Sequence, residues 1–181
     1  MMFLYTDIFI ISFLSNESSK EIADYGFPLN IANTLMIIPL TIIQVEIENI
    51  KKDQRISKSI QRKIIKLAFL GSLAVMVLFL GLINTLYVKY DNTLIIFILI
   101  LIAKMIQSSN VLLGTRIAIN KMYNKNLLVT SSALILNFTL SFFAYKYFKL
   151  TGIAAASIIS LTYIHILLTY FNNKHFNNLK R

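Results

Sequence analysis

The chain has 181 residues, of which 56% are hydrophobic and only 14% are charged, and its mean hydropathy is +0.67. So few polar residues cannot cover a water-facing surface, which argues against a soluble domain. The formal net charge of +10 would suit a nucleic-acid-binding protein, but the basic residues follow the membrane pattern described below, so we expect no nucleic-acid partner. The absence of cysteine excludes disulfides, thiolate metal sites and a cysteine nucleophile.

Six apolar segments predict membrane-spanning helices in a single domain over residues 1–181. Their approximate bounds are 2–18, 28–47, 64–86, 93–119, 127–147 and 152–170. At a rise of 1.5 Å per residue, about 20 residues cross about 30 Å of hydrocarbon. The first apolar run, Met2 to Leu14, crosses only if its helix continues through residue 18, and we expect it to be the remainder of a longer reading frame. The sequence thus predicts an all-α integral membrane protein with six helices in one bundle.

Lysine and arginine are concentrated in alternate gaps between these segments. Thirteen lie between the second and third, between the fourth and fifth, or after the sixth, and only four lie in the other gaps. Because cytoplasmic loops are enriched in basic residues, both termini are predicted to be cytoplasmic. In residues 51–66, Ile56, Ile60 and Ile64 recur at helical spacing among basic residues, which predicts an amphipathic helix on the cytoplasmic membrane surface. This helix either anchors the protein on anionic headgroups or binds a regulatory lipid or partner.

Polar residues gather on one face of the second segment. On a helical wheel at 100° per residue, the polar residues within about 60° of Asn30 are Asn33, Thr34, Thr41, Gln44 and Glu48, and Ile37 lies among them. Such a stripe either bonds to a neighbouring helix or lines a water-filled pathway. Pro39 lies in the same segment, and because it lacks an N–H and clashes with the carbonyl of Leu35, we expect a kink there.

Charged residues inside the segments are costly and normally face a cavity or a partner. Lys104 is expected near the centre of the bilayer, with Gln107 and Ser108 on its face. It either has a structural role, as an ion pair for which Asp7 is the best-placed acid or as a neutral lysine, or it lines a pathway. Asp7 alternatively serves as a proton or cation site. Arg116, at the cytoplasmic end of the same segment, is either an interfacial anchor or a pathway residue.

The remaining motifs favour packing over chemistry. Gly152, Ala156 and Ser160 form a small-residue face that lets another helix approach closely. His165 is expected to be a hydrogen-bonded interior histidine, and with His175 in a polar tail no metal set can be assembled. Without a glycine-rich phosphate loop, a nucleophile elbow or paired carboxylates, we expect no enzymatic activity, cofactor or metal.

Two stretches resemble segments of polysaccharide flippases. Asp7-Ile-Phe-Ile-Ile-Ser-Phe-Leu, followed by Ile22-Ala-Asp-Tyr-Gly-Phe-Pro-Leu-Asn-Ile-Ala and Ile37-Ile-Pro, is similar to the seventh and eighth helices of that family. Those helices typically show an Asp before an apolar run, a Gly-x-Tyr-x-x-Ala element and a later Ile-Pro. Asn137-Phe-Thr-Leu and Leu150-Thr-Gly-Ile-Ala-Ala-Ala-Ser are similar to the family's closing pair of helices. The chain departs from the pattern at Ala23 and Ala154, where glycine is usual, and at Glu46 and Glu48, which stand where a proline would follow.

The resemblance implies that the chain is the C-terminal half of a twelve-helix O-antigen-type flippase in the multidrug, oligosaccharidyl-lipid and polysaccharide exporter superfamily. Such proteins move lipid-linked oligosaccharides across the bacterial inner membrane by alternating access, and several use cation gradients. A pyrophosphate-linked substrate requires buried cations, and sugar hydroxyls require amide and hydroxyl groups. The implied substrate pathway comprises Asp7, Asn30, Asn33, Thr34, Thr41, Gln44, Lys104, Gln107, Ser108, Arg116 and Asn137. The implied partners are the lipid bilayer, the lipid-linked oligosaccharide, and a separate N-terminal half or a second copy of the chain.

Two other functions stay open. The chain is alternatively an inactive fragment or a membrane interaction subunit without transport activity. A membrane-embedded glycan enzyme would need large loops with acidic or histidine groups, and the gaps between the segments are too short for such loops.

The lysine distribution makes a testable prediction about topology. With both termini cytoplasmic, residues 51–66 lie inside the cell and residues 16–23 lie outside. Because the chain has no native cysteine, a membrane-impermeant thiol reagent should label Ser18→Cys but not Ser57→Cys in intact cells. The reverse labelling pattern would overturn the assignment.

Overall fold

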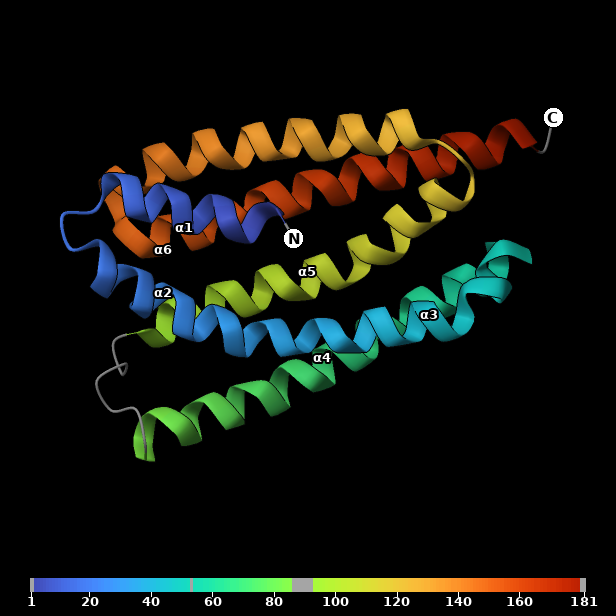
Figure 1. The fold of residues 1–181 in the computed structure, drawn as a ribbon. Helices are drawn as coiled ribbons and strands as arrows, with labels where there is room; N and C mark the ends of the chain where they lie inside the picture. Colours follow the sequence, from blue (N-terminus) through green and yellow to red (C-terminus); the bar gives the residue numbers. More distant parts are fainter. Residues whose placement is uncertain (1, 53, 86–92, 180–181) are drawn as a thin grey trace.

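The computed structural model describes the backbone of residues 2–52, 54–85 and 93–179, and the side chains of residues 6–51, 58–85 and 93–174 (Figure 1). Within these residues every element is helical. The elements are α1 (Met2–Leu14), α2 (Ser18–Asn33), the 3-10 helix η1 (Thr34–Met36), α3 (Ile37–Lys52), α4 (Gln54–Thr85), α5 (Leu94–Ile119) and α6 (Tyr123–Leu179). The predicted all-α class is confirmed. Leu86, the expected end of the third segment, and the side chain of Ile56 lie outside the described residues.

Four helical stretches are long and apolar enough to cross a membrane. They are Ser18–Lys51, Lys58–Thr85, Leu94–Ile119 and Tyr123–Lys174. Large apolar side chains on their outer faces, including Val45, Val77, Ile95 and Ile135, are more than half exposed. An apolar surface of this extent is typical of lipid contact rather than of a water-facing surface. The four stretches therefore indicate a membrane protein. The helix α1 is not among them, because it ends at Leu14 rather than continuing through residue 18 as expected.

The first of these stretches joins α2, η1 and α3. It begins at Ser18, ten residues before the expected start of the second segment, because Tyr25 packs with Leu29 and Ala32 in the main core and so keeps this part helical. The 3-10 turn falls where the sequence predicts a disturbance. Pro39 has no N–H to bond the carbonyl of Leu35, and Leu35 lies within η1.

The helix α6 folds back on itself. Lys149 has φ 51° and ψ −136°, and Figure 1 shows the chain reversing direction there, in agreement with the expected short turn between residues 147 and 152. Gly152 packs directly against the preceding part of the helix. A Cβ atom at this position would lie 2.7 Å from the carbonyl carbon of Ala144 and 3.0 Å from the Cβ of Phe148. Ala156 and Ser160 are buried on the same face, which confirms the close packing expected from the small residues.

The basic segment at residues 51–66 differs from its expected form. Its residues from Gln54 onward belong to α4, which continues unbroken to Thr85 rather than turning into a separate span. Ile60 and Ile64 pack with Ile43 and Ile50 of α3 and with Leu112 of α5. The apolar face of this segment is therefore buried against protein, and its basic face is left exposed.

The main core connects α1, α2, α4, α5 and α6. Buried residues of α1, α2, α4, α5 and α6 form one cluster, in which the rings of Phe79 and Phe97 stack with centroids 3.8 Å apart. Around it the helices lie side by side with their turns at two ends (Figure 1). At one side of the bundle lie the last turns of α3 and α5, the first turns of α4 and α6, and the last turn of α6. We call this side the basic end, because Lys58, Arg62 and Arg116 line a common hollow there.

The turn between α5 and α6 at the basic end is a Schellman motif. The N–H of Met122 donates to the carbonyl of Ile117 at 3.0 Å, and the N–H of Lys121 donates to the carbonyl of Ala118 at 3.0 Å. Lys121 has φ 56°, the left-handed conformation that this motif requires. Glycine is the usual residue at this position, so a lysine there is no local signal for the turn.

Candidate functional site

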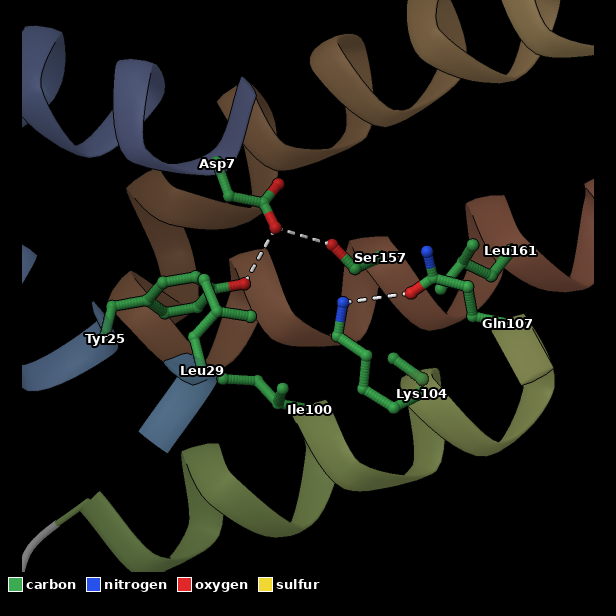
Figure 2. Close-up of a pocket in the computed structure, with 9 residues that line it drawn as sticks. Asp7, Tyr25, Leu29, Ile100, Lys104, Gln107, Ser157 and Leu161 are labelled. Carbon is green, nitrogen blue, oxygen red and sulfur yellow. Dashed lines mark hydrogen bonds between the residues drawn. The ribbon is translucent and has the colours of Figure 1, made fainter. Parts of the chain in front are cut away.

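Polar side chains from four helices meet inside the bundle around a small cavity. Figure 2 shows Asp7 of α1, Tyr25 of α2, Lys104 and Gln107 of α5, and Ser157 of α6 facing this space. The cavity measures about 20 Å³, enough for about one water molecule. We call these five residues, with Asn137 of α6, the polar centre.

The carboxylate of Asp7 holds the polar centre together. It is only 4% exposed, and it accepts hydrogen bonds from the hydroxyl of Tyr25 at 2.8 Å, from Oγ of Ser157 at 2.9 Å and from Nδ2 of Asn137 at 3.0 Å. These donors come from α2 and from both parts of α6. A buried carboxylate is tolerated only with such partners, so this one group fixes the relative positions of three helical segments.

Helical periodicity explains how Asp7 reaches the interior. Ile10 and Ile11 follow it by three and four residues, and both are buried, at 1% and 0% exposure. Residues at these spacings share a helix face. The two isoleucines thus direct that face of α1 into the core, and Asp7 is carried inward with them.

Lys104 faces the same cavity but does not pair directly with Asp7. Its ammonium group donates to Oε1 of Gln107 at 2.9 Å, and the side chain is 6% exposed. Among the residues whose side chains are described, no ion pair within 4.0 Å joins Lys104 to a carboxylate. The structural ion pair with Asp7 is therefore not formed. Ser108, on the next turn, is fully buried and donates to the backbone carbonyl of Lys104 at 2.8 Å.

Two buried oxygen atoms on one face of α6 lack a hydrogen-bond partner, and one of them belongs to Asn137 of the polar centre. Oδ1 of Asn137 and Oγ of Ser141, one turn further along α6, are buried without a hydrogen-bond partner. One carboxylate with neutral amide and hydroxyl oxygens is a set of hard donors, suited to a proton or a small cation of low charge. In the side chains described, no three His, Asp or Glu residues lie close enough to hold a metal ion.

The predicted stripe on the second segment lies elsewhere. Asn30, Thr34, Thr41 and Gln44 are exposed on the outside of the bundle, and Asn33 is partly exposed. The hydroxyl of Thr34 donates to the carbonyl of Ile31 in its own helix at 2.7 Å. None of these residues lines the cavity of the polar centre.

Arg116 lies in a third location. It is partly exposed at the basic end and lines a hollow with residues of α4 and the last part of α6. The structure thus brings Asp7, Lys104, Gln107 and Asn137 together, with Ser108 packed beside them, and separates them from both Arg116 and the stripe.

His165 is hydrogen-bonded inside the bundle, as the sequence predicts. Its Nδ1 lies 2.9 Å from Oδ1 of Asn110, and Nδ2 of Asn110 donates to the carbonyl of Leu161 at 2.8 Å. Both contacts link α5 to α6. The contact between His165 and Asn110 therefore joins the two helices.

Sequence reasoning missed Tyr25, Ser141 and Ser157. Tyr25 precedes the expected start of the second segment, so it was not considered at membrane depth. Ser157 lies between Ala156 and Ser160 in the sequence but does not belong to their small-residue face, so no pattern singles it out. A weak signal was present, because Ser141 and Asn137 are four residues apart and so share a helix face.

Comparison of the chain with family models, with curated proteins and with solved structures gives no match.

The hydrogen bonds to Asp7 predict different outcomes for two substitutions. Asp7→Ala leaves the donors of Tyr25, Asn137 and Ser157 buried without an acceptor, so the free energy of unfolding should fall by at least about 3 kcal/mol. Asp7→Asn should lower the free energy of unfolding much less. If the amide group of Asn137 flips, its Oδ1, which has no partner in the structure, can accept a hydrogen bond from the new amide at position 7. Thermal unfolding in detergent measures both effects.

The matched control is Asp24→Ala, at a partly exposed acid on α2. It should change the free energy of unfolding by less than about 0.5 kcal/mol. Equal losses for Asp7→Ala and Asp7→Asn would show that the charge of Asp7, rather than its hydrogen bonds, stabilises the bundle.

Proposed function

We propose that this chain is one half of a bacterial inner-membrane transporter that moves lipid-linked oligosaccharide by alternating access. On this proposal six segments cross the membrane. They are α1 together with the turn at residues 15–17, the stretch α2–η1–α3, α4, α5 and the two parts of α6. Both termini lie in the cytoplasm, and the chain is not an enzyme. An N-terminal half or a second copy of the chain completes the transporter.

The observation that supports the proposal most is the exposed polar stripe on α2, η1 and α3. Asn30, Thr41 and Gln44 face outward from a stretch that is apolar enough to cross a membrane. Amide and hydroxyl groups facing hydrocarbon are costly, so such a face requires water or a protein partner. A pathway between this half and its partner supplies both, and it offers hydrogen-bonding groups to sugar hydroxyls.

The polar centre supports a conformational cycle. Its hydrogen bonds connect α1 to α2 and to both parts of α6 through the one carboxylate of Asp7. Protonation of that carboxylate, or cation binding to it, would change which of these bonds form. A group of this kind can couple an ion gradient to a change in helix packing, as alternating access requires.

The alternative is a membrane subunit or inactive fragment without transport activity. It accounts for the same stripe, because an interaction surface also requires polar groups that pair across helices. The two proposals differ in the role of Lys104. A transporter uses it as an interior cation for its substrate, whereas in a subunit without transport activity it contributes only to packing, through its hydrogen bond to Gln107.

Lys104→Ala should reduce glycan export at least tenfold while the amount of protein in the membrane stays near normal. Its removal takes away a buried cation whose central position costs around 2.5–3.5 kcal/mol, so folding should not suffer. Export of the lipid-linked glycan and membrane abundance are measured in cells that contain the complete transporter.

Lys146→Ala is the control, because Lys146 is exposed and lies near the end of the bundle opposite the basic end. It should leave glycan export and membrane abundance unchanged. Loss of the protein itself in Lys104→Ala, restored by a second change at Asp7, would instead assign the lysine a structural role. Normal export in Lys104→Ala would favour the subunit without transport activity.

The stripe predicts that the chain works with a partner. If the partner is a second copy, single cysteines in place of Thr41 or Gln44 should form intermolecular disulfides in the membrane, because a two-fold axis along the membrane normal places equal depths opposite each other. If the partner is a separate half, these disulfides should not form. The mass of the complex, measured by light scattering and corrected for detergent, should still exceed the mass of one chain.

Val77→Cys is the matched control, at an exposed position on the apolar face of α4, and it should give no disulfide. A monodisperse monomer that restores glycan export when reconstituted alone would refute the need for a partner and the view of this chain as half a transporter.

A further inference from the structure

A second polar hollow, separate from the polar centre, opens at the basic end. It measures about 340 Å³ and lies between α4, α5 and the last part of α6. Lys58 and Arg62 line it from α4, and Arg116 lines it from the last turn of α5. Among the residues whose side chains are described, no carboxylate lines this hollow. Three cations thus surround one space.

These three cations are not neutralised by acids in the described part of the chain. The ion pair found there joins Lys20 to Glu17, at 3.7 Å, near the turn between α1 and α2. The nearest acids in sequence with described side chains, Glu46 and Glu48, are on α3 and do not line the hollow. Convergent cations without a carboxylate form a site for an anion, and guanidinium groups match the oxygens of a phosphate.

Polar atoms on the α6 side of the hollow also lack partners. Asn172 is only 3% exposed, and its Nδ2 donates to the carbonyls of Leu168 at 2.8 Å and Leu113 at 3.2 Å. These bonds fix the orientation of the amide, yet its Oδ1 receives no hydrogen bond. Oγ1 of Thr169, three residues earlier on the same face, is also buried without a partner. Buried polar atoms without partners are rare and cost about 1–3 kcal/mol each.

The two unpaired atoms indicate what else the ligand contains. A fully ionised phosphate offers only acceptors, so it satisfies the cations but cannot donate to Oδ1 of Asn172. That oxygen requires a donor, such as a hydroxyl group. The ligand should therefore carry a phosphate and at least one hydroxyl.

We propose that this hollow binds a phosphate ester that carries free hydroxyl groups, with Lys58, Arg62 and Arg116 around the phosphate and Asn172 and Thr169 around a hydroxyl. The hollow lies at the ends of helices that are apolar enough to cross the membrane, which is where the headgroups of a bilayer lie. Basic pockets between membrane helices commonly bind anionic headgroups. The same chemistry occurs in a phospholipid with a glycerol headgroup and in free glycerol phosphate. The site does not depend on transport activity.

Lipid retention tests the proposal on the full chain. The protein is purified in neutral detergent, exposed to phosphatidylglycerol, phosphatidic acid or phosphatidylcholine, and bound lipid is counted by native mass spectrometry. Phosphatidylglycerol should bind at least several-fold more tightly than phosphatidic acid, which lacks headgroup hydroxyls, and phosphatidylcholine should bind least. Arg116→Gln should weaken phosphatidylglycerol binding about tenfold, which corresponds to about 1.4 kcal/mol. Thr169→Val should reduce the preference over phosphatidic acid.

Lys63→Gln is the matched control, since Lys63 is exposed on α4 and does not line the hollow, and its binding should be unchanged. Thermal unfolding of each variant in neutral detergent without lipid separates lost binding from lost folding. Free glycerol phosphate is the soluble arm: if it displaces phosphatidylglycerol at micromolar concentration, the site is real and its ligand is a free phosphate ester. Equal binding of both anionic lipids, with Arg116→Gln and Lys63→Gln indistinguishable, would overturn the proposal in favour of diffuse attraction to negative charge.

Discussion

Burial of one carboxylate constrains the rest of this bundle. Asp7 is almost inaccessible, and its three hydrogen-bond donors come from α2 and from both parts of α6. Removing a carboxylate from water is expensive, and the cost is offset only while all three donors stay in place. The apolar contacts around them, such as the stacked rings of Phe79 and Phe97, are less directional and permit small shifts. The Asp7 carboxylate therefore decides which arrangement of the helices is stable.

The polar residues of this chain are divided among three environments. The polar centre is enclosed, the stripe on α2, η1 and α3 faces outward, and the basic hollow opens at one end of the helices. Each environment suits different chemistry: an enclosed site for a proton or small cation, an outward polar face for a partner or a water-filled pathway, and a cationic hollow for a phosphate. Their separation means that each can be tested by substitutions that leave the others intact.

Lys104 and Arg116 illustrate how similar charges acquire different roles. Both are on α5, twelve residues apart, which is about 18 Å along a helix. Lys104 is enclosed beside Gln107 and shares a cavity with Asp7. Arg116 stands at the end of the helix with Lys58 and Arg62. A single phosphate group cannot contact both residues at once in this arrangement.

The sequence by itself determined the class of this protein and most of its helices. Long apolar runs predict membrane helices because the hydrocarbon thickness fixes their length, and α5 ends where the sequence places it. The turn near residue 149 and the disturbance near Pro39 were also predictable, since both follow from local chain chemistry. The early start of α2 was not, because tertiary packing of Tyr25 keeps that part helical.

Only the tertiary structure decided the candidate sites. Asp7 and Ser157 are 150 residues apart and Asn137 is 130 residues from Asp7, so no local pattern indicates that they meet. The stripe was visible as a periodic pattern, but periodicity gives the face of a helix and not what that face contacts. For the same reason the amphipathic residues of α4 were expected against headgroups, whereas Ile60 and Ile64 pack against α3 and α5. Sequence periodicity determines which side chains share a face, and only the packing of helices against one another determines whether that face meets protein, water or lipid.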